Sequence, residues 1–413
     1  MEGKKLLQIE VCMNTGSTGR ISEDISGIVK KNGWNAYLIH GARYNNPPSS
    51  MIEFQLGSIV DEYKHFFEHI VFDNDGLASR KATRRIVSKI EEIKPDIIQL
   101  HDIHDHWLNY RILFEYFATL DTPIVWTQHD CWGFTGGCGH FSDPECYKWR
   151  DGTCSKGCPQ VSGMRKLFEK TNKHFRLRRE LLTSIKDLTI VSVSYWMESV
   201  VKQSFLKEKK IVTIHNGVDI NLFKQSDSTG VREKYGIGSS KYVLGVSSQW
   251  LARKGWFDFQ KLSHIIPHDI KIVLIGVTEK QQKEAAKYGI IGIRRTENIK
   301  EMAALYSGAM MFCNLTYMDT FPTTNIEALA CATPVLTYNT DGSVEAADDE
   351  TGWVVEQGDI KGVVDIILRQ SQLSIVDINT QRNKCRSRAV KYFDKDKCFA
   401  AYLDLYKELI SKH

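Results

Sequence analysis

Short apolar runs separated by polar and glycine-rich stretches recur along the whole chain, and each run has the length of a buried strand. In the first half the runs predict strands at residues 6–12, 34–40, 96–100, 122–128, 188–193 and 210–214. In the second half they predict strands at residues 242–247, 272–275, 291–293, 310–315, 334–338 and 352–355. Apolar residues at helical spacing predict helices over 21–31, 82–93, 165–182, 298–306, 385–393 and 398–410. This alternation is typical of an α/β fold with parallel sheets.

Two stretches interrupt the alternation. Residues 42–62 are polar, contain two consecutive prolines and predict a long loop. The turn His215-Asn-Gly-Val-Asp219 predicts a hinge, after which the alternation restarts. We therefore predict two Rossmann-like domains facing a cleft, with the boundaries 1–214 and 215–395 and a last helix, 396–413, that packs back toward the first domain. Strand ends line such a cleft, which is where open α/β sheets bind ligands.

Composition and charge narrow the class of protein. The chain has 413 residues, of which 42% are hydrophobic and 25% charged, as in globular proteins that dissolve in water. A net charge of +4 is mild, and because no nucleic-acid-binding motif is present we predict no nucleic acid partner. No apolar run is long enough to span a bilayer, and the first residues predict a strand rather than a signal peptide. The expected location is the cytoplasm.

The strongest candidate for chemistry is the stretch from Asp319 to Glu327, where a predicted loop turns into a short helix. Pro322 suits the first helical position, and Thr323 and its neighbour can help to satisfy the free amide groups there. A helix N-terminus attracts anions, and two carboxylates can bind hydroxyl groups. The combination suits a sugar nucleotide, although an ordinary capped helix with surface acids would give the same pattern.

Three further motifs follow predicted strands. Gly16 and Gly19 lie in a glycine-rich turn that lets the backbone approach a ligand, although a plain tight turn has the same sequence. His129 ends a strand and is either a ligand-binding or a structural histidine. Arg253 and Lys254 follow another strand, where cations neutralise a diphosphate if they are not simply surface charges.

Histidines and acids crowd the segment 101–107, directly after a predicted strand. Their spacing does not match the arrangement of metallo-hydrolases that use several histidines. We therefore favour a loop at the carboxyl end of the strand over a metal site.

A cysteine-rich insertion occupies residues 131–160, and it contains Cys138, Cys146, Cys154 and Cys158. The insertion has too few apolar residues to hold a loop by packing. Four thiolates could do so around a tetrahedral zinc ion, which would be structural because they would close its coordination shell. Disulfides and free thiols remain open alternatives.

The predicted helix 165–182 carries seven basic residues beside its apolar ones. Such a helix can lie on an anionic membrane surface or meet a diphosphate-linked acceptor, and a solvated basic face is the alternative. We accordingly consider peripheral contact with the inner face of the cytoplasmic membrane.

Taken together, these motifs resemble the retaining glycosyltransferases of family 4, which have the GT-B fold of two Rossmann-like domains. The resemblance covers nearly the whole chain and is carried by the following segments: Asn14-Thr-Gly-Ser-Thr-Gly19, Thr127-Gln-His-Asp130, Asn216-Gly-Val-Asp219, Arg253-Lys-Gly255, and Asp319 through Glu327 to Pro334. The cysteine-rich segment from Trp132 to Gln160 resembles a subset that builds bacterial surface polysaccharides of the colanic-acid and O-antigen type.

The resemblance implies a role for each motif. Glu327 would bind the ribose hydroxyls of the donor, and Arg253 and Lys254 its diphosphate. The remaining residues would contact the sugar or the phosphates: His129, Asp319, the amides near Phe321, Pro322 and Thr323, and the glycines Gly16 and Gly19. The chain departs from the family where Asp319 replaces the usual glutamate and Ser247-Ser248 replaces a Gly-Arg pair.

The expected reaction moves a sugar from a UDP- or GDP-sugar to a hydroxyl of a lipid-linked or oligosaccharide acceptor, with retention of anomeric configuration. We expect no divalent metal or other cofactor in catalysis, because no Asp-x-Asp pair stands out as a Mg²⁺ ligand. The alternatives are a nucleotide-sugar epimerase or hydrolase on the same fold and a zinc-dependent interaction protein.

Overall fold

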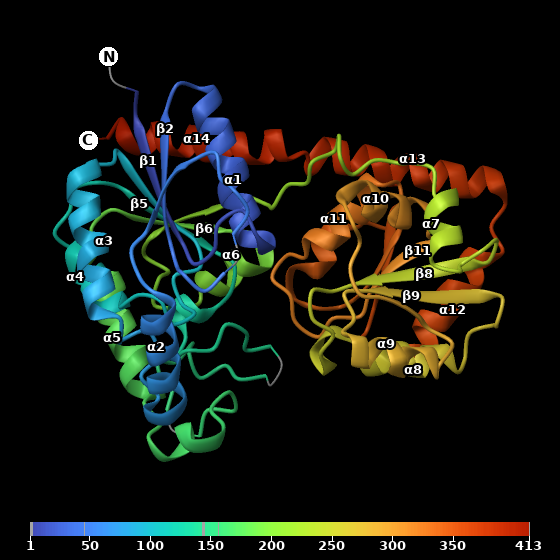
Figure 1. The fold of residues 1–413 in the computed structure, drawn as a ribbon, viewed down its shortest axis with the longest axis horizontal. Helices are drawn as coiled ribbons and strands as arrows, with labels where there is room; N and C mark the ends of the chain where they lie inside the picture. Colours follow the sequence, from blue (N-terminus) through green and yellow to red (C-terminus); the bar gives the residue numbers. More distant parts are fainter. Residues whose placement is uncertain (1–2, 45, 143–144, 156, 413) are drawn as a thin grey trace. The chain divides into compact units, whose positions relative to one another are not determined.

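Two α/β units make up the protein in the computed structural model, which describes residues 3–44, 46–142, 145–155 and 157–412 (Figure 1). Unit 1 comprises residues 1–215 and 399–413, and unit 2 comprises residues 216–398. Each unit is a parallel sheet with helices packed on its faces. The prediction of two Rossmann-like domains is confirmed.

Unit 1 contains a seven-stranded parallel sheet in the order β3-β2-β1-β4-β5-β6-β7. Its strands are β1 (Lys5–Glu10), β2 (Asn35–His40), β3 (Ile52–Gln55), β4 (Ile97–Leu100), β5 (Ile124–Gln128), β6 (Leu188–Ser192) and β7 (Lys210–Thr213). Its helices are α1 (Gly16–Lys31), α2 (Ile59–Phe72), α3 (Arg80–Ile93), α4 (Tyr110–Phe117), α5 (Thr171–Ser184) and α6 (Tyr195–Val201), with short 3-10 turns η1 (Trp132–Phe134) and η2 (Gly163–Leu167).

Unit 2 contains a six-stranded parallel sheet in the order β10-β9-β8-β11-β12-β13. Its strands are β8 (Lys241–Val246), β9 (Ile270–Ile275), β10 (Ile291–Ile293), β11 (Met311–Asn314), β12 (Val335–Tyr338) and β13 (Gly352–Val355). Its helices are α7 (Thr229–Lys234), α8 (Trp256–Ser263), α9 (Glu279–Ala286), α10 (Ile299–Gly308), α11 (Thr323–Ala330), α12 (Ile360–Ser371) and α13 (Ile375–Tyr392), with 3-10 turns η3 (Ala252–Lys254) and η4 (Asp341–Ala346).

The central strands are buried and mostly apolar because helices cover both faces of each sheet. Every residue of β4, β5, β6 and β12 is buried. Helices begin where a side chain can satisfy free amides, as Ser58 does for α2 and Asn298 for α10. These local signals explain why the strand pattern can be read directly from the sequence.

The long loop predicted for residues 42–62 is wrong, because this segment contains β3 and the start of α2. β3 is a short edge strand with mostly exposed residues, so it lacks the apolar run of a central strand. The helix predicted from residue 21 begins instead at Gly16, whose positive φ of 66° starts its first turn.

The single helix predicted for residues 165–182 is also wrong, because the segment divides into η2 and α5. Asp73 causes the break. Its carboxylate accepts hydrogen bonds from the Arg165 side chain (2.8 and 3.0 Å) and from the Lys170 backbone amide (2.6 Å). These contacts bend the chain between the two elements.

The last helix, α14 (Lys395–Ile410), ends in unit 1. Tyr402 contacts Thr127 through hydroxyl groups 3.0 Å apart, and the Tyr406 hydroxyl donates to Gln99 Oε1 at 3.0 Å. Both tyrosines are buried. Across the described residues, no helix combines the length and the apolar character needed to cross a membrane.

Candidate functional site

In unit 2 the strand order reverses between β8 and β11. β9 and β10 lie on one side of this point, and β12 and β13 on the other. Parallel α/β sheets bind ligands at the carboxyl ends of strands beside such a switch point. The loops that follow β8 and β11 are residues 247–255 and 315–322, and they contain the predicted diphosphate and sugar residues.

Lys254 and Asp319 join these two loops. Lys254 Nζ lies 2.7 Å from Asp319 Oδ2, and both side chains are 23% exposed. The Arg253 carbonyl accepts the Tyr317 backbone amide at 2.8 Å, which fixes the loops relative to each other. The structure therefore brings together two predicted site residues that are 65 positions apart in sequence.

Gly255 makes this approach possible. Its φ is 77°, and a Cβ atom placed there would lie 2.4 Å from the Leu315 carbonyl oxygen and 2.8 Å from the Leu315 Cβ. A side chain at this position would push apart the loops that carry Lys254 and Asp319. The glycine in the motif Arg253-Lys-Gly255 thus has a steric role that its loop position alone does not reveal.

α11 presents its N-terminus at the same edge, with Pro322 as N-cap and without a side-chain cap. Asn325 fixes the start of the helix, since its Oδ1 accepts from Asn314 Nδ2 (2.8 Å) and its Nδ2 donates to the Ser343 carbonyl (3.0 Å). Phe321 is buried, and its carbonyl accepts from the Asn216 side chain at 3.2 Å. The backbone amides of this loop are therefore held in place for an anion.

Glu327 lies within α11 and is partly buried. Its Oε2 accepts a hydrogen bond from the Tyr306 hydroxyl at 3.0 Å. Burial and the Glu327 carboxylate raise the pKa of Tyr306 well above its ordinary value, so the hydroxyl stays protonated and donates. Tyr306 orients the predicted ribose-binding carboxylate, and nothing in the sequence pattern connects these residues.

Unit 1 has its own switch point between β1 and β4, and a pocket of about 260 Å³ lies there. The pocket is lined by Val11, Cys12, Thr15, Gly16, Ser17, Thr18, Tyr44, Asp102, His104 and Asp105. Gly16 is the predicted glycine that reaches this lining. Gly19 instead lets α1 pack closely on the preceding loop, since a Cβ there would lie 3.0 Å from Cys12 Sγ.

A group of ionisable side chains lies at this pocket. His104 Nε2 is 2.8 Å from Asp130 Oδ2 and 3.8 Å from Asp102 Oδ1. Burial opposes a charge on His104, but the Asp130 and Asp102 carboxylates outweigh it and raise the pKa of His104 to about 10. Burial together with the Asp102 charge raises the pKa of Glu10 to about 8. The two carboxylates therefore favour the charged form of His104, whereas burial favours the neutral form of Glu10.

His129 is not a member of this group and contacts a neighbouring histidine instead. Its Nε2 is 3.0 Å from His101 Nδ1, and His101 Nε2 is in turn 2.8 Å from Gln8 Oε1. Burial lowers the pKa of His129 to about 4, so the ring is neutral at pH 7. The histidine that lines the pocket is His104, in the loop that the sequence places at the end of β4. The catalytic role of His129 stays a prediction.

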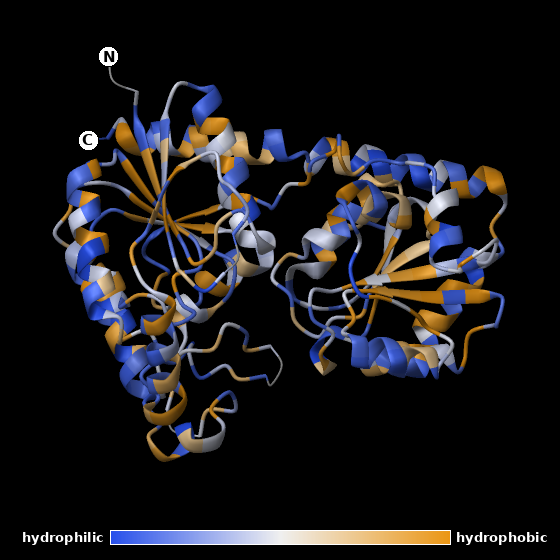
Figure 2. Ribbon diagram, in the orientation of Figure 1, coloured by the Kyte–Doolittle hydropathy of each residue, from blue (hydrophilic) through white to orange (hydrophobic). Residues whose placement is uncertain are grey.

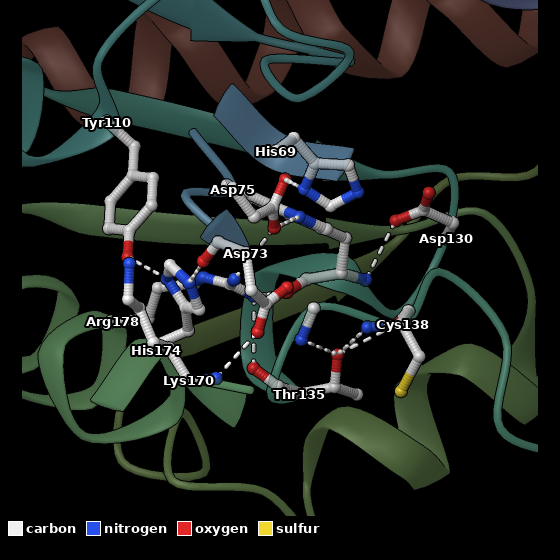
Figure 3. A network of polar contacts seen from close by, with 12 residues as sticks. His69, Asp73, Asp75, Tyr110, Asp130, Thr135, Cys138, Lys170, His174 and Arg178 are labelled. Carbon is white, nitrogen blue, oxygen red and sulfur yellow. Dashed lines mark hydrogen bonds and ion pairs between the residues drawn. The ribbon is translucent and has the colours of Figure 1, made fainter. Parts of the chain in front are cut away.

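A buried polar network contacts the start of the cysteine-rich insertion (Figure 3). Arg178 is completely buried and donates to the Trp132 carbonyl (2.7 Å), the Thr135 carbonyl (3.1 Å) and Asp75 Oδ2 (3.2 Å). Burial alone would raise the pKa of Asp75, but the Arg178 charge holds it well below its usual range. The Arg165 side chain binds Asp73, and the Lys170 ammonium donates to the Phe72 carbonyl at 2.6 Å. Together with Arg178, three of the side chains predicted to form a basic helix face therefore contact unit 1 itself.

In the part of the chain that the structure describes, the cysteines predicted as zinc ligands form no disulfide. Burial raises the pKa of Cys138 to about 12 and that of Cys154 to about 11, and neighbouring cysteines add to both shifts. Within the described residues, the groups whose donor atoms lie within 4.8 Å of one another contain histidines and aspartates but none of these cysteines. Structural zinc at Cys138, Cys146, Cys154 and Cys158 stays a prediction that metal analysis can test.

Comparison with known proteins identifies the family to which the two units belong. The family model "Glycosyltransferase Family 4" matches residues 61–222, and "Glycosyl transferases group 1" matches residues 227–391. The chain belongs to the GT-B glycosyltransferases. The matched ranges cover much of unit 1 and most of unit 2, including both switch-point loops of unit 2.

The individual proteins that the chain resembles share a quarter of its residues or fewer in the aligned regions. The chain is 24% identical over 325 residues to the putative colanic acid biosynthesis glycosyl transferase WcaC of Escherichia coli K12, covering 76% of this chain and 77% of that one. It is 25% identical over 223 residues to the capsular polysaccharide biosynthesis glycosyltransferase CapM of Staphylococcus aureus, but this match spans 50% of the chain and only 58% of CapM. Among solved structures, Anabaena HepE in complex with UDP-glucose has a TM-score of 0.64 at 16% identity, over 99% of this chain and 100% of that one. This GT-B chain thus resembles surface-polysaccharide enzymes.

Proposed function

We propose that the protein is a glycosyltransferase that moves a sugar from a UDP- or GDP-sugar to a hydroxyl of a lipid-linked or oligosaccharide acceptor during bacterial surface polysaccharide synthesis. The observation that carries the proposal is the edge of unit 2, where Lys254, Asp319 and the α11 N-terminus meet at one switch point. Glu327 lies one turn further into the same helix. The similarity to WcaC and to CapM supports a polysaccharide product, and that to HepE supports a nucleotide-sugar donor.

The proposed chemistry follows from the charges at this edge. Cleavage of the anomeric carbon–oxygen bond places negative charge on the leaving diphosphate. Lys254, Arg253 and the amides of the α11 N-terminus are cationic or dipolar groups that stabilise such charge without moving. Asp319 and Glu327 would accept hydrogen bonds from donor hydroxyls. Retention and independence of divalent metal are parts of this proposal.

A panel of nucleotide sugars tests it. We expect one donor to raise the thermal midpoint of the protein, because a ligand at 100 times its Kd adds about 2.7 kcal/mol to the free energy of unfolding. The same donor should then be consumed only when a saccharide acceptor is present, with the anomeric configuration of the product retained by NMR and the rate unchanged by EDTA. Donor consumed equally fast without acceptor would show an epimerase or hydrolase instead.

A further inference from the structure

Helix α2 buries polar side chains and exposes most of its apolar ones. Its buried residues are Glu62 and His65, at 2% and 0% exposure. The Glu62 carboxylate accepts the backbone amides of residues 42 and 43, and His65 Nδ1 lies 2.9 Å from the Ser79 hydroxyl. Polar contacts therefore hold the helix to unit 1, whereas a helix of a globular protein ordinarily buries its apolar side.

α2 and the turn η2 are neighbours, and hydrophobic residues colour parts of both in Figure 2. We call their exposed apolar side chains together the α2–η2 surface. It comprises Ile59, Val60, Tyr63, Phe66, Phe67, Ile70 and Phe72 of α2 with Met164, Leu167 and Phe168 at η2, each at least 40% exposed. The rings of Phe72 and Phe168 join the two elements at 5.5 Å between centroids. Exposed apolar surfaces of this extent mark interaction sites.

Lys64 of α2 and Lys166 of η2 are exposed cations on these elements, and Asp61 is an exposed acid in the first turn of α2. An apolar helix face with aromatic residues and nearby lysines matches the boundary between anionic headgroups and acyl chains. We infer that the α2–η2 surface inserts into the anionic face of a lipid bilayer. This inference rests on the proposed function, since it places the enzyme beside a lipid-linked acceptor.

Vesicle co-sedimentation of the full chain tests this inference. The outward residues Val60, Phe67 and Leu167 are changed together to Ser, with Ile375→Ser/Val376→Ser in unit 2 as the matched control, because those residues are equally exposed. We expect the wild type and the control to bind vesicles containing anionic lipid, and the triple variant to bind at least about tenfold more weakly. Vesicles of zwitterionic lipid alone should bind less protein.

Two results would overturn the inference: no vesicle binding by the wild type, or equal binding by the triple variant. Self-association that the triple variant abolishes would show that a second copy covers the surface instead. Transfer to a water-soluble acceptor should be unchanged in the triple variant. If the wild-type protein transfers no sugar from any donor, the proposed function is refuted. The inference that the α2–η2 surface binds membranes is then still decided by the vesicle experiment.

A second observation concerns the inner side of α2. His69 Nδ1 and both ring nitrogens of His106 are buried and have no hydrogen-bond partner among the described residues. His69 Nδ1 lies 3.8 Å from Asp75 Oδ1, and Figure 3 shows these two side chains facing each other. One donor atom from each of His69, Asp75 and His106 lies within 4.8 Å of the other two. Asp105 and His106 both have positive φ, at 74° and 70°. Such backbone strain persists only where the surroundings impose it.

The geometry points to a site for a divalent ion such as Zn²⁺ formed by His69, Asp75 and His106. Two imidazoles and a carboxylate are a ligand set that zinc accepts, with a fourth position left for water. The His69 and Asp75 donor atoms would have to approach each other by only about 0.5 Å to reach zinc distances. The ion would fasten α2 to the loop that follows β4.

Cobalt substitution distinguishes this site from the cysteines. Protein freed of metal is titrated with Co²⁺, and we expect one equivalent to give visible bands without thiolate charge transfer in the near ultraviolet. His69→Gln and His106→Gln should each weaken that binding at least about tenfold, whereas His268→Gln, an exposed histidine in unit 2, should not. X-ray absorption spectroscopy of the zinc-loaded wild type should show nitrogen and oxygen ligands. Thiolate ligands only, no binding, or unchanged binding in both variants would overturn the site.

Discussion

Glu327→Ala is expected to lower kcat/KM for the sugar-nucleotide donor by roughly 100- to 1000-fold, or about 3–4 kcal/mol. The carboxylate is held by the buried Tyr306 hydroxyl at 3.0 Å, so a donor hydroxyl meets an acceptor already in position. Hydrogen bonds to a charged group contribute about 1.5–3 kcal/mol each, and a ribose offers two hydroxyls. Steady-state kinetics with the donor identified by the thermal panel measure the effect.

The variant Tyr306→Phe tests how much the orientation of the Glu327 carboxylate contributes, apart from its charge. It keeps the carboxylate and removes only the hydroxyl that orients it, so we expect a loss of about tenfold or less, mainly in donor KM. Glu327→Gln should lie between the two, because the amide retains one acceptor oxygen. If Glu327→Ala transfers at the wild-type rate while its thermal midpoint is unchanged, the assignment of the donor site to α11 is wrong.

In metal-free protein, Arg178→Leu is expected to cost about 3–5 kcal/mol of unfolding free energy, because it leaves the buried Asp75 carboxylate without its countercharge. The guanidinium also stacks on Trp132, with 4.0 Å between its carbon and the ring centroid, and it bridges two backbone carbonyls. Denaturant unfolding followed by fluorescence measures the loss. A variant within 1 kcal/mol of the wild type would contradict the role of this ion pair.

The pH dependence of the same variant provides an independent check. The folded pKa of Asp75 is depressed, so its ionisation stabilises the wild type fully above the unfolded Asp pKa of about 3.9 and less as pH falls below it. The stability difference between the wild type and Arg178→Leu should therefore be largest near neutral pH and narrow on acidification. The double variant Asp75→Asn/Arg178→Leu should be less destabilised than the sum of the two single changes.

Parts of both sites could be predicted from the sequence because their signals are local. The loop after β8 contains Arg253 and Lys254, and the loop after β11 leads from Asp319 into the helix that contains Glu327. A residue after a parallel strand lies at the carboxyl edge of the sheet whatever the strand order. Their meeting could not be predicted, because the adjacency of β8 and β11 is a non-local pairing.

The positions that sequence reasoning missed depend on contacts between distant segments. Tyr306 orients Glu327 from a different helix, and the Asp102–His104–Asp130 group comes from the ends of two strands. The segment 165–182 has a helical pattern, but Asp73 breaks it from nearly a hundred residues away. No periodicity within a segment can report a partner outside it.

The sequence by itself determined the α/β class, the repeated parallel architecture and the strand-end location of the predicted donor-binding residues, because apolar runs and glycine turns act over a few residues. Only the tertiary structure decided which strands are neighbours and which charges are buried. It also decided the orientation of α2, whose apolar residues could equally have filled a core. Glu62 and His65 find their hydrogen-bond partners in unit 1, and this contact turns the apolar side of the helix outward.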